Sequence, residues 1–530
     1  AAALAFVLPY MAALFQAFSG ASSVSMLSVF SDPFLYKTIQ FTLLQAGLST
    51  LAALALGLPG AWLIGAGRFK GSGVLRALSA VPFAMPPILV VLGFVLFFGN
   101  AGWANRLFMN LSGSEEPVLN ILYRPAAIIL AHAFYNFPII LRLVGDSIAQ
   151  SRLNYSAVAA SLGASGPKTF ITILLPLAFP SVIAASLLVF LYCFTSFAVV
   201  LVLGGGPATS TLAVEIYRYA RISLDFRTAG ALAAVETGIA AIAFLLYALS
   251  SRWARSLVPA EEKENRDLEH SGSSITGKIF IGIYLCIAAA LVLGPLLSVP
   301  LESFLHKASR STDASFSLHW WSMIGSSALP ALGRSILLAA VAASLATIFS
   351  VLAGTTSILA KDRKLFKTSL STLVSLPLAS SGIVLALGWL ILYGNAVSRS
   401  FWSVAFVHAV SALPFAFRSV SEGLAVLPPS SMDAAAVYGA SPFKRTMTIA
   451  LPCSAKRIRS AWSFSAAISL GELNAVLMPG LDNWETLPLL IYRAAGSYRF
   501  GAACAAGTLL AICCATAFAI SEFHYTRRKR

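Results

Sequence analysis

The chain is poor in charged residues. Of its 530 residues, 11% are Asp, Glu, Lys or Arg, whereas 58% are hydrophobic. A soluble domain carries about 25% charged residues. This shortage excludes a molecule whose surface faces mostly water, and the lipid bilayer is the solvent that suits such a composition.

Acidic residues are the scarcer of the two charge types. There are 21 of them against 37 basic residues, which gives a formal net charge of +16. In a soluble protein this excess would suggest a nucleic-acid partner. Here Lys and Arg stand in short loops between apolar runs, which is the pattern that orients membrane proteins. We therefore expect membrane lipid, and no nucleic acid, around this chain.

Cysteine and histidine are also rare, with six of each. The cysteines lie in or beside apolar runs, and no two have C-x-x-C spacing. This pattern favours small buried side chains over a disulfide framework or a zinc site. His132 and His408 have no acidic or thiol cluster around them in the sequence, so we expect packing or hydrogen bonding from them. No metal site is predicted.

Long apolar runs are what the sequence has in abundance. Because backbone groups in lipid must be paired within the chain, runs of about 20 apolar residues are expected to be helices. The predicted fold class is an all-α polytopic membrane protein with about twelve spans. They cover roughly residues 1–18, 39–66, 78–99, 124–145, 177–203, 228–250, 278–300, 334–360, 372–394, 402–423, 456–478 and 501–521.

One polar segment of mixed charge, residues 251–277, interrupts this series. It predicts a cytoplasmic linker between a first transmembrane half at 1–250 and a second at 278–530. With six spans per half, the basic loops after the second and eighth spans fall on one side, together with the basic end of the chain. We therefore expect both termini in the cytoplasm, although loop 205–227 places three arginines on the other side.

The two halves repeat each other. Chance similarity between apolar sequences would match Leu and Ala, not His, Pro, Arg and Lys at one fixed separation. The pairs separated by 276 residues are His132–His408, Pro138–Pro414, Arg142–Arg418, Gly163–Gly439, Lys168–Lys444 and Pro176–Pro452, and those separated by 295 include Pro82–Pro377 and Gly93–Gly388.

The most informative repeated segment lies between the fourth and fifth spans of each half. An Ala-rich stretch leads to a glycine, and a proline follows 13 residues later. Ala favours helix, Gly allows a tight reversal, and Pro suits the first turn of the next helix. The positions that we single out are Ala157, Gly163, Ser165, Lys168 and Pro176 in the first copy, and Asp433, Gly439, Ser441, Lys444 and Pro452 in the second.

This doubled segment resembles the cytoplasmic loop of permease subunits in binding-protein-dependent ABC importers of type I. In that family the loop is the coupling helix that docks into a groove of the ATPase. Its usual first residue is Glu, whereas here it is Asp433 or Ala157, so we expect the two ATPase contacts to differ. The resemblance covers both halves.

The resemblance also implies the partners and the location. It implies a bacterial inner membrane, two copies of an ABC ATPase that hold ATP and Mg, and an extracytoplasmic substrate-binding protein. No catalytic residue and no cofactor are expected on this chain. The nearest approach to a phosphate loop, residues 163–169, has its glycines too close together and follows no strand.

The substrate is suggested by a narrower resemblance. Residues 131–138, 193–207 and 496–501 look like those of the thiamine and thiamine pyrophosphate permeases. Ferric-iron permeases share the fused two-half architecture and are the alternative; other small anions and polyamines stay open.

Five charged or polar residues are candidates for substrate and partner contact. Glu472 and Glu236 lie within predicted spans, where an acidic residue is costly and marks either a pathway or a polar packing contact. Ser196 is the first-half counterpart of Glu472. Arg218 and Arg493 occupy matching Ile-Tyr-Arg triplets in the outer segments 205–227 and 481–500, as contacts for the binding protein or as parts of simple turns.

Two other classes of protein are weighed against the importer. A secondary transporter would place charged residues or broken helices at the membrane midplane, which Glu472 and Glu236 support only thinly. It would also leave the doubled loop unexplained. A membrane enzyme would need a convergent set of His, Asp and Glu at one depth, and the sequence indicates none. An ATPase that copurifies with the chain would separate the importer from both.

Overall fold

The computed structural model describes residues 2–16, 26–65, 74–76, 78–79, 85–257, 275–307, 314–359, 364–479 and 484–526. These residues are almost entirely helical. The first half contains α1 (Ala2–Gln16), α2 (Met26–Ser31), α3 (Pro33–Gly65), α5 (Pro87–Phe98), α6 (Trp103–Ser112), α7 (Pro125–Ser161), α8 (Gly166–Thr169), η1 (Phe170–Leu174), α9 (Leu175–Phe194), α10 (Ala198–Leu203), η2 (Pro207–Thr209), α11 (Leu212–Arg221) and α12 (Phe226–Leu257).

The second half repeats this order and adds a short antiparallel hairpin. Its strands pair Leu305 with Phe316 and Lys307 with Ala314. The elements are α13 (Ile275–Ser303), β1 (Leu305–Lys307), β2 (Ala314–Phe316), α14 (His319–Leu359), α15 (Lys364–Ser375), η3 (Leu376–Ala379), α16 (Gly382–Ser398), α17 (Phe401–Ala425), α18 (Pro429–Val437), α19 (Pro442–Arg445), η4 (Thr446–Ala450), α20 (Leu451–Gly471), α21 (Asn474–Leu477), α22 (Leu487–Gly496) and α23 (Phe500–Thr526).

The described residues contain nine helices that are long and apolar enough to cross a membrane. A tenth span is the bent pair Leu365–Ala379 and Gly382–Gly394, whose two parts meet at 98°. Two of the twelve predicted spans, 1–18 and 456–478, correspond to helices that are too short or too charged to be counted among these. Helix α1 has 15 residues, or about 22 Å, against a hydrocarbon core of about 30 Å. Helix α20 carries three basic residues, Lys456, Arg457 and Arg459.

The fifth helix of each half is broken, which the sequence interpretation did not foresee. The predicted spans 177–203 and 456–478 run through Thr195–Phe197 and Glu472–Leu473, where the helices stop and restart as α10 and α21. The end of the first half is also different from its predicted form. Helix α12 continues to Leu257, so the predicted linker begins inside a helix, and residues 258–274 lie outside the described residues.

The first described helix of each half packs against a helix of the other half. Helix α1 packs against α16 of the second half, and α13 packs against α5 of the first. A glycine makes each contact possible, because a Cβ at Gly93 would collide with the carbonyl of Pro295, and one at Gly388 with the carbonyl of Pro9. The repeated glycines at an offset of 295 residues are therefore explained by close packing between the halves.

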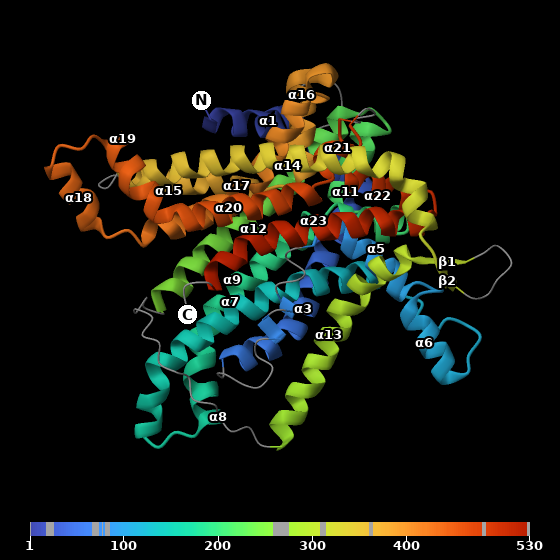
Figure 1. The fold of residues 1–530 in the computed structure, drawn as a ribbon, viewed down its shortest axis with the longest axis horizontal. Helices are drawn as coiled ribbons and strands as arrows, with labels where there is room; N and C mark the ends of the chain where they lie inside the picture. The colour runs from blue at the N-terminus through green and yellow to red at the C-terminus, as the bar shows by residue number, and fades with distance from the viewer. Residues whose placement is uncertain are drawn as a thin grey trace.

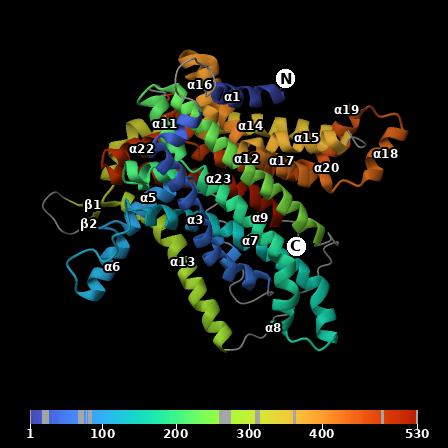
Figure 2. The same ribbon diagram turned by 180° about the vertical axis from the view of Figure 1, so that it is seen from behind.

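The remaining membrane helices form two bundles that diverge. In one bundle α7 packs against α3 and α9, and in the other α17 packs against α14 and α20. Figure 1 and Figure 2 show the bundles spreading apart, with α8 at the end of the first and α18 and α19 at the end of the second. Helices α11 and α22 lie toward the opposite end.

Candidate functional site

The repeated segments 157–176 and 433–452, here called the coupling loops, have nearly the same backbone in both halves. Gly163 and Gly439 each adopt a φ of +76°, a left-handed conformation that favours glycine. The residue after each glycine donates its backbone N–H to the carbonyl five positions earlier, at 3.0 Å in both loops. This bond is one of the pair that closes a helix C-terminus in a Schellman motif.

After the glycine turn, each loop enters the membrane helix through the same sequence of elements. A four-residue helix, α8 or α19, is followed by a five-residue π-helical turn, η1 or η4. Pro176 and Pro452 then occupy the second position of α9 and α20. Thr169 and Arg445 donate backbone N–H groups to the carbonyls of Ser165 and Ser441, both at 2.9 Å.

The two coupling loops differ in how they join the preceding helix. In the first half α7 runs without interruption through 37 residues to Ser161, so Ala157 lies in its last turns. In the second half α17 ends at Ala425, and α18 begins at Pro429 and contains Asp433. Pro428 and Pro429 explain this break, since proline cannot continue a helix that precedes it.

Large apolar side chains are exposed at the tips of both loops. Leu162 and Tyr438 occupy equivalent positions and are 82% and 91% exposed. Val437 and Phe443 are similarly open, and Lys168 and Lys444 add exposed positive charge nearby. Exposed apolar groups with a charged surround are typical of surfaces that bind another protein.

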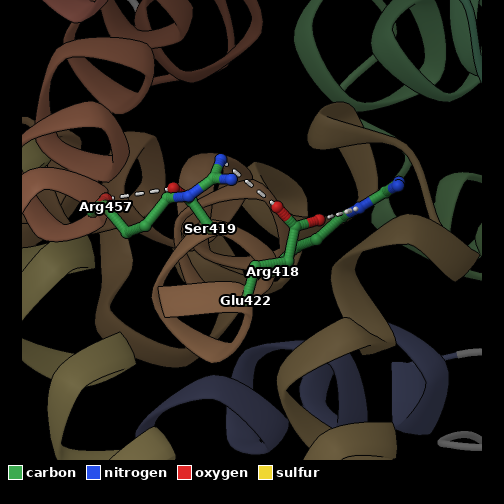
Figure 3. A network of polar contacts seen from close by, with 4 residues as sticks. All are labelled: Arg418, Ser419, Glu422 and Arg457. Carbon is green, nitrogen blue, oxygen red and sulfur yellow. Dashed lines mark hydrogen bonds and ion pairs between the residues drawn. The ribbon is translucent and has the colours of Figure 1, made fainter. Parts of the chain in front are cut away.

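An ionic cluster joins the two helices that flank the second coupling loop. Glu422 of α17 pairs with Arg418 at 3.3 Å and with Arg457 of α20 at 3.5 Å. Ser419 donates its hydroxyl to the carbonyl of Arg457 at 3.0 Å. Figure 3 shows these four residues bridging the helices. All of the charged members are about half exposed.

A hydroxyl pair joins the equivalent helices of the first half. Ser181 of α9, at the position of Arg457, donates to Ser147 of α7 at 3.0 Å, and both side chains are buried. Each coupling loop is thus attached to a pair of helices that side-chain hydrogen bonds or ion pairs join.

A cavity of about 260 Å³ lies where the two halves meet, here called the central cavity. Two helix breaks line it, Thr195–Phe197 between α9 and α10 and Gly471–Leu473 between α20 and α21, together with Met85–Pro87 at the start of α5. The structure therefore brings the predicted pathway residues Ser196 and Glu472 to one site. Binding sites built from broken membrane helices are a general feature of transporters.

Glu472 lies in the break between α20 and α21, directly after Gly471, the last residue of α20. Its Oε1 accepts a hydrogen bond from the backbone N–H of Asn474 at 2.9 Å. Within the described residues, it is the one charged side chain on the wall of the central cavity. It therefore bonds the first residue of α21 and lines the central cavity, while its role in a pathway stays a prediction.

The aromatic residues that form the other walls of the central cavity were not predicted from the sequence. Aromatic rings come from both halves, namely Tyr135 and Tyr192 from the first and Phe415 and Phe464 from the second. The sequence offered a partial signal, since Tyr135 lies in the stretch 131–138 that resembles the thiamine permeases. No spacing rule connects that stretch with Phe415 or Phe464, which belong to the other half.

Two buried polar residues of α7 complete the cavity. Asn136 donates its side-chain N–H to the carbonyl of His132 at 2.9 Å, and His132 Nδ1 lies 3.4 Å from the hydroxyl of Ser49. In the part of the chain that the structure describes, Nε2 of His132 and Oδ1 of Asn136 have no hydrogen-bond partner. The repeat-related His408 instead bonds Ser469 through Nδ1 at 2.8 Å.

Glu236, the third pathway candidate, lies elsewhere. It is completely buried in α12, beside Ser381 at the bend before α16, and it does not line the central cavity. The sequence placed it in a span correctly but could not show which way it faces. Neither carboxylate oxygen of Glu236 has a hydrogen-bond partner among the described residues, and its role in the pathway or in packing stays a prediction.

Arg218 and Arg493 occupy α11 and α22, at the end of the molecule away from the coupling loops. Arg218 pairs with Glu215 at 3.3 Å, and Arg493 pairs with Glu485 at 3.1 Å. Both arginine side chains remain partly exposed. Within the described residues, no group of three His, Cys, Asp or Glu side chains is arranged to hold a metal ion.

Comparisons with known proteins agree with this geometry. The thiamine transport system permease protein ThiP of Brucella suis biovar 1 is 28% identical over 505 residues, 94% of this chain and 89% of that protein. The protein of the same name from Escherichia coli K12 is 26% identical over 503 residues, covering 93% and 90%. The spermidine/putrescine permease PotB of E. coli K12 is 31% identical over 174 residues, 33% of this chain and 63% of that protein.

A family model matches both halves separately, at residues 57–260 and 346–530. Each matched region includes one coupling loop, one broken fifth helix and one wall of the central cavity. The chain belongs to the family of inner membrane components of binding-protein-dependent transport systems.

Proposed function

We propose that this chain is the permease of an importer that carries thiamine or its phosphates, and that it binds two copies of its ATPase through the two coupling loops. As an inner membrane component of a binding-protein-dependent system, it is a multi-pass permease that depends on a substrate-binding protein and an ATPase. It supplies the path and no catalytic group. Both termini are placed in the cytoplasm, on the side of the coupling loops.

The observation that carries this proposal is the pair of coupling loops at the ends of two diverging bundles. Two equivalent, exposed apolar tips suit two equivalent sockets on an ATPase dimer. The substrate assignment is supported by the relatives, which match over almost the whole chain and are named thiamine permeases.

The geometry supports transport by alternating access. ATP closes the ATPase dimer and brings the coupling loops together. Because the helices behind each loop are cross-linked, by Glu422 in one half and Ser181 in the other, each bundle moves as a unit. The central cavity then opens toward α11 and α22, where Arg218 and Arg493 contact the loaded binding protein. ATP hydrolysis separates the loops again and releases the substrate inward.

The test is the ATPase activity of the reconstituted complex, with the chain, its ATPase and a thiamine-loaded binding protein. We expect strong stimulation for the native chain and none for Gly439→Pro, because proline cannot adopt a φ of +76°. Gly113→Pro is the matched control. Gly113 has a φ of +68° and lies in the loop after α6, far from the coupling loops in sequence.

Three outcomes would contradict the proposal in different ways. Stimulation only by an iron-loaded binding protein would keep the mechanism and replace the substrate. Equal loss of stimulation in Gly439→Pro and Gly113→Pro would remove the special role of the coupling loop. Failure of the chain to associate with any ATPase would leave a secondary transporter as the better explanation.

A further inference from the structure

We propose that the central cavity is itself a binding site for a flat organic monocation, with Glu472 as its counter-charge and His132 and Asn136 as its hydrogen-bonding partners. The inference rests on the proposed function in one respect, because thiamine is the cation that we expect there. It adds that the permease recognises the substrate chemically and does not merely let it pass.

Charge is the first argument. Glu472 is the one charged residue on the cavity wall among those that the structure describes, and no Lys or Arg side chain accompanies it there. A carboxylate within a membrane protein is costly unless a positive partner balances it. Its Oε1 bonds to the backbone N–H of Asn474, which offsets part of this cost. A bound cation offsets the remainder.

The aromatic walls are the second argument. Tyr135 and Tyr192 come from the first half, and Phe415 and Phe464 come from the second, with the last two ring centroids 5.7 Å apart. Aromatic faces attract a cation through their negative electrostatic potential, and they stack with flat rings. A delocalised heterocyclic cation uses both effects, whereas a hydrated metal ion uses neither.

The unpartnered polar atoms are the third and most specific argument. Nε2 of His132 and Oδ1 of Asn136 are buried without a hydrogen-bond partner in the described chain, and both residues line the cavity. The two side chains are 2% and 1% exposed. Buried polar atoms are nearly always paired, so an orphan in a cavity indicates a missing partner. An aminopyrimidine ring offers both a donor and acceptors.

The site is asymmetric, and this fixes the orientation of the ligand. Position 472 carries the carboxylate in the second half, whereas its repeat counterpart Ser196 is neutral. The polar pair His132 and Asn136 lies on α7 of the first half. The cationic ring therefore lies toward the second half and the aminopyrimidine toward the first. One carboxylate balances one positive charge.

The experiment measures thiamine binding to the purified full chain in nanodiscs, without the binding protein or the ATPase. Radiolabelled thiamine is titrated against the native chain, Glu472→Gln and Glu236→Gln. We expect saturable binding to the native chain, weakened at least tenfold by Glu472→Gln. Glu236→Gln is the matched control, because it neutralises a buried carboxylate that lies away from the cavity, and we expect it to bind like the native chain.

A neutral ligand separates charge recognition from shape. The thiophene analogue of thiamine has the same outline but lacks the positive charge on the ring. We expect it to bind the native chain more weakly than thiamine, and Glu472→Gln to weaken it no further. Asn136→Leu should weaken both ligands about equally, which keeps the inference testable if Glu472→Gln proves unstable on gel filtration.

The result that overturns the inference is equal thiamine affinity in the native chain and Glu472→Gln, or equal affinity of the native chain for both ligands. Failure of this inference and failure of the proposed function look different. If the thiamine-loaded binding protein stimulates ATP hydrolysis but the native chain binds no thiamine, the cavity site is wrong and the function stands. If the cavity binds thiamine but the loaded binding protein never stimulates hydrolysis, the site stands and the function is wrong.

Discussion

The two halves share one architecture but differ in the details that matter for coupling and recognition. In the first half α7 runs straight into the coupling loop, whereas in the second a Pro-Pro step separates α17 from α18. A buried hydroxyl pair links α7 and α9 in the first half, and a half-exposed ionic cluster links α17 and α20 in the second. The repeated backbone geometry suits the proposed common movement of the two coupling loops. The side chains that differ between the halves suit separate roles in coupling and in recognition.

The central cavity shows the same division. The first half contributes His132, Asn136 and the neutral Ser196, and the second contributes Glu472. Two identical halves would present two carboxylates or none. Fusion of the halves in one chain allows such differences to persist, because each half always meets the same partner.

The largest effect is expected where the halves hold each other. Gly388→Ala should destabilise the chain by about 1–3 kcal/mol or more, because its Cβ collides with the carbonyl of Pro9 and backbone cannot yield easily. Gly93→Ala should cost a similar amount against Pro295. Thermal unfolding in detergent, followed by tryptophan fluorescence, measures both. Gly282→Ala on α13 has open space and is the control; a loss as large there would refute the cross-packing explanation.

The next effect tests whether the coupling loops are unequal. Asp433→Ala should lower stimulated ATPase activity roughly tenfold, since a hydrogen bond to a charged group is worth about 1.5 kcal/mol. Ala157→Ser, at the equivalent position of the first loop, should leave the activity nearly unchanged. The measurement is hydrolysis by the reconstituted complex with loaded binding protein. Equal losses at both positions would mean that the two ATPase contacts are equivalent after all.

A smaller effect is expected from the buried hydroxyl link of the first half. Ser181→Ala should destabilise the chain by about 1 kcal/mol, because the hydroxyl of Ser147 loses its buried partner. The denaturation midpoint in detergent measures this loss. The double variant with Ser147→Ala should recover part of it, and no recovery would argue that the two serines act independently.

The smallest effect is expected from the ionic cluster of the second half. Glu422→Gln should cost less than about 1 kcal/mol, since its partners are exposed and water weakens such pairs. The cost should shrink further at about 1 M salt, where charges are screened within roughly 3 Å. Unfolding at low and high salt measures both quantities. A loss larger than that of Ser181→Ala would reverse the comparison between the halves.

The backbone of the two coupling loops could be predicted from the sequence because its pattern is local. A glycine, a proline and the spacing between them define a turn and a helix start wherever they occur. The fixed offset between Gly163 and Gly439 then predicted two such loops on one side of the membrane. The helical fold could be predicted from composition, because a chain in lipid must pair its backbone N–H and C=O groups internally.

The central cavity could be predicted only in part. Glu472 was conspicuous as an acid in an apolar run, but its partners Tyr192 and Phe415 come from different halves. Their proximity depends on packing between bundles, which no residue spacing encodes. The helix breaks were missed because the apolar runs on the two sides of Ser196, and of Glu472, together have the length of one continuous span. For Glu236 the same reasoning selected an acidic residue that is buried in α12 and does not line the central cavity.

The exchange of first helices between the halves has a consequence for biosynthesis. Helix α5 is inserted into the membrane before α13, its packing partner, has been synthesised. The surface of α5 at Gly93 stays uncovered until the linker and α13 have left the ribosome. The contact between the two halves is therefore completed by α13, which lies in the middle of the chain. Expression of the two halves as separate chains should yield a working permease only if both reach the same patch of membrane together, which one continuous chain guarantees.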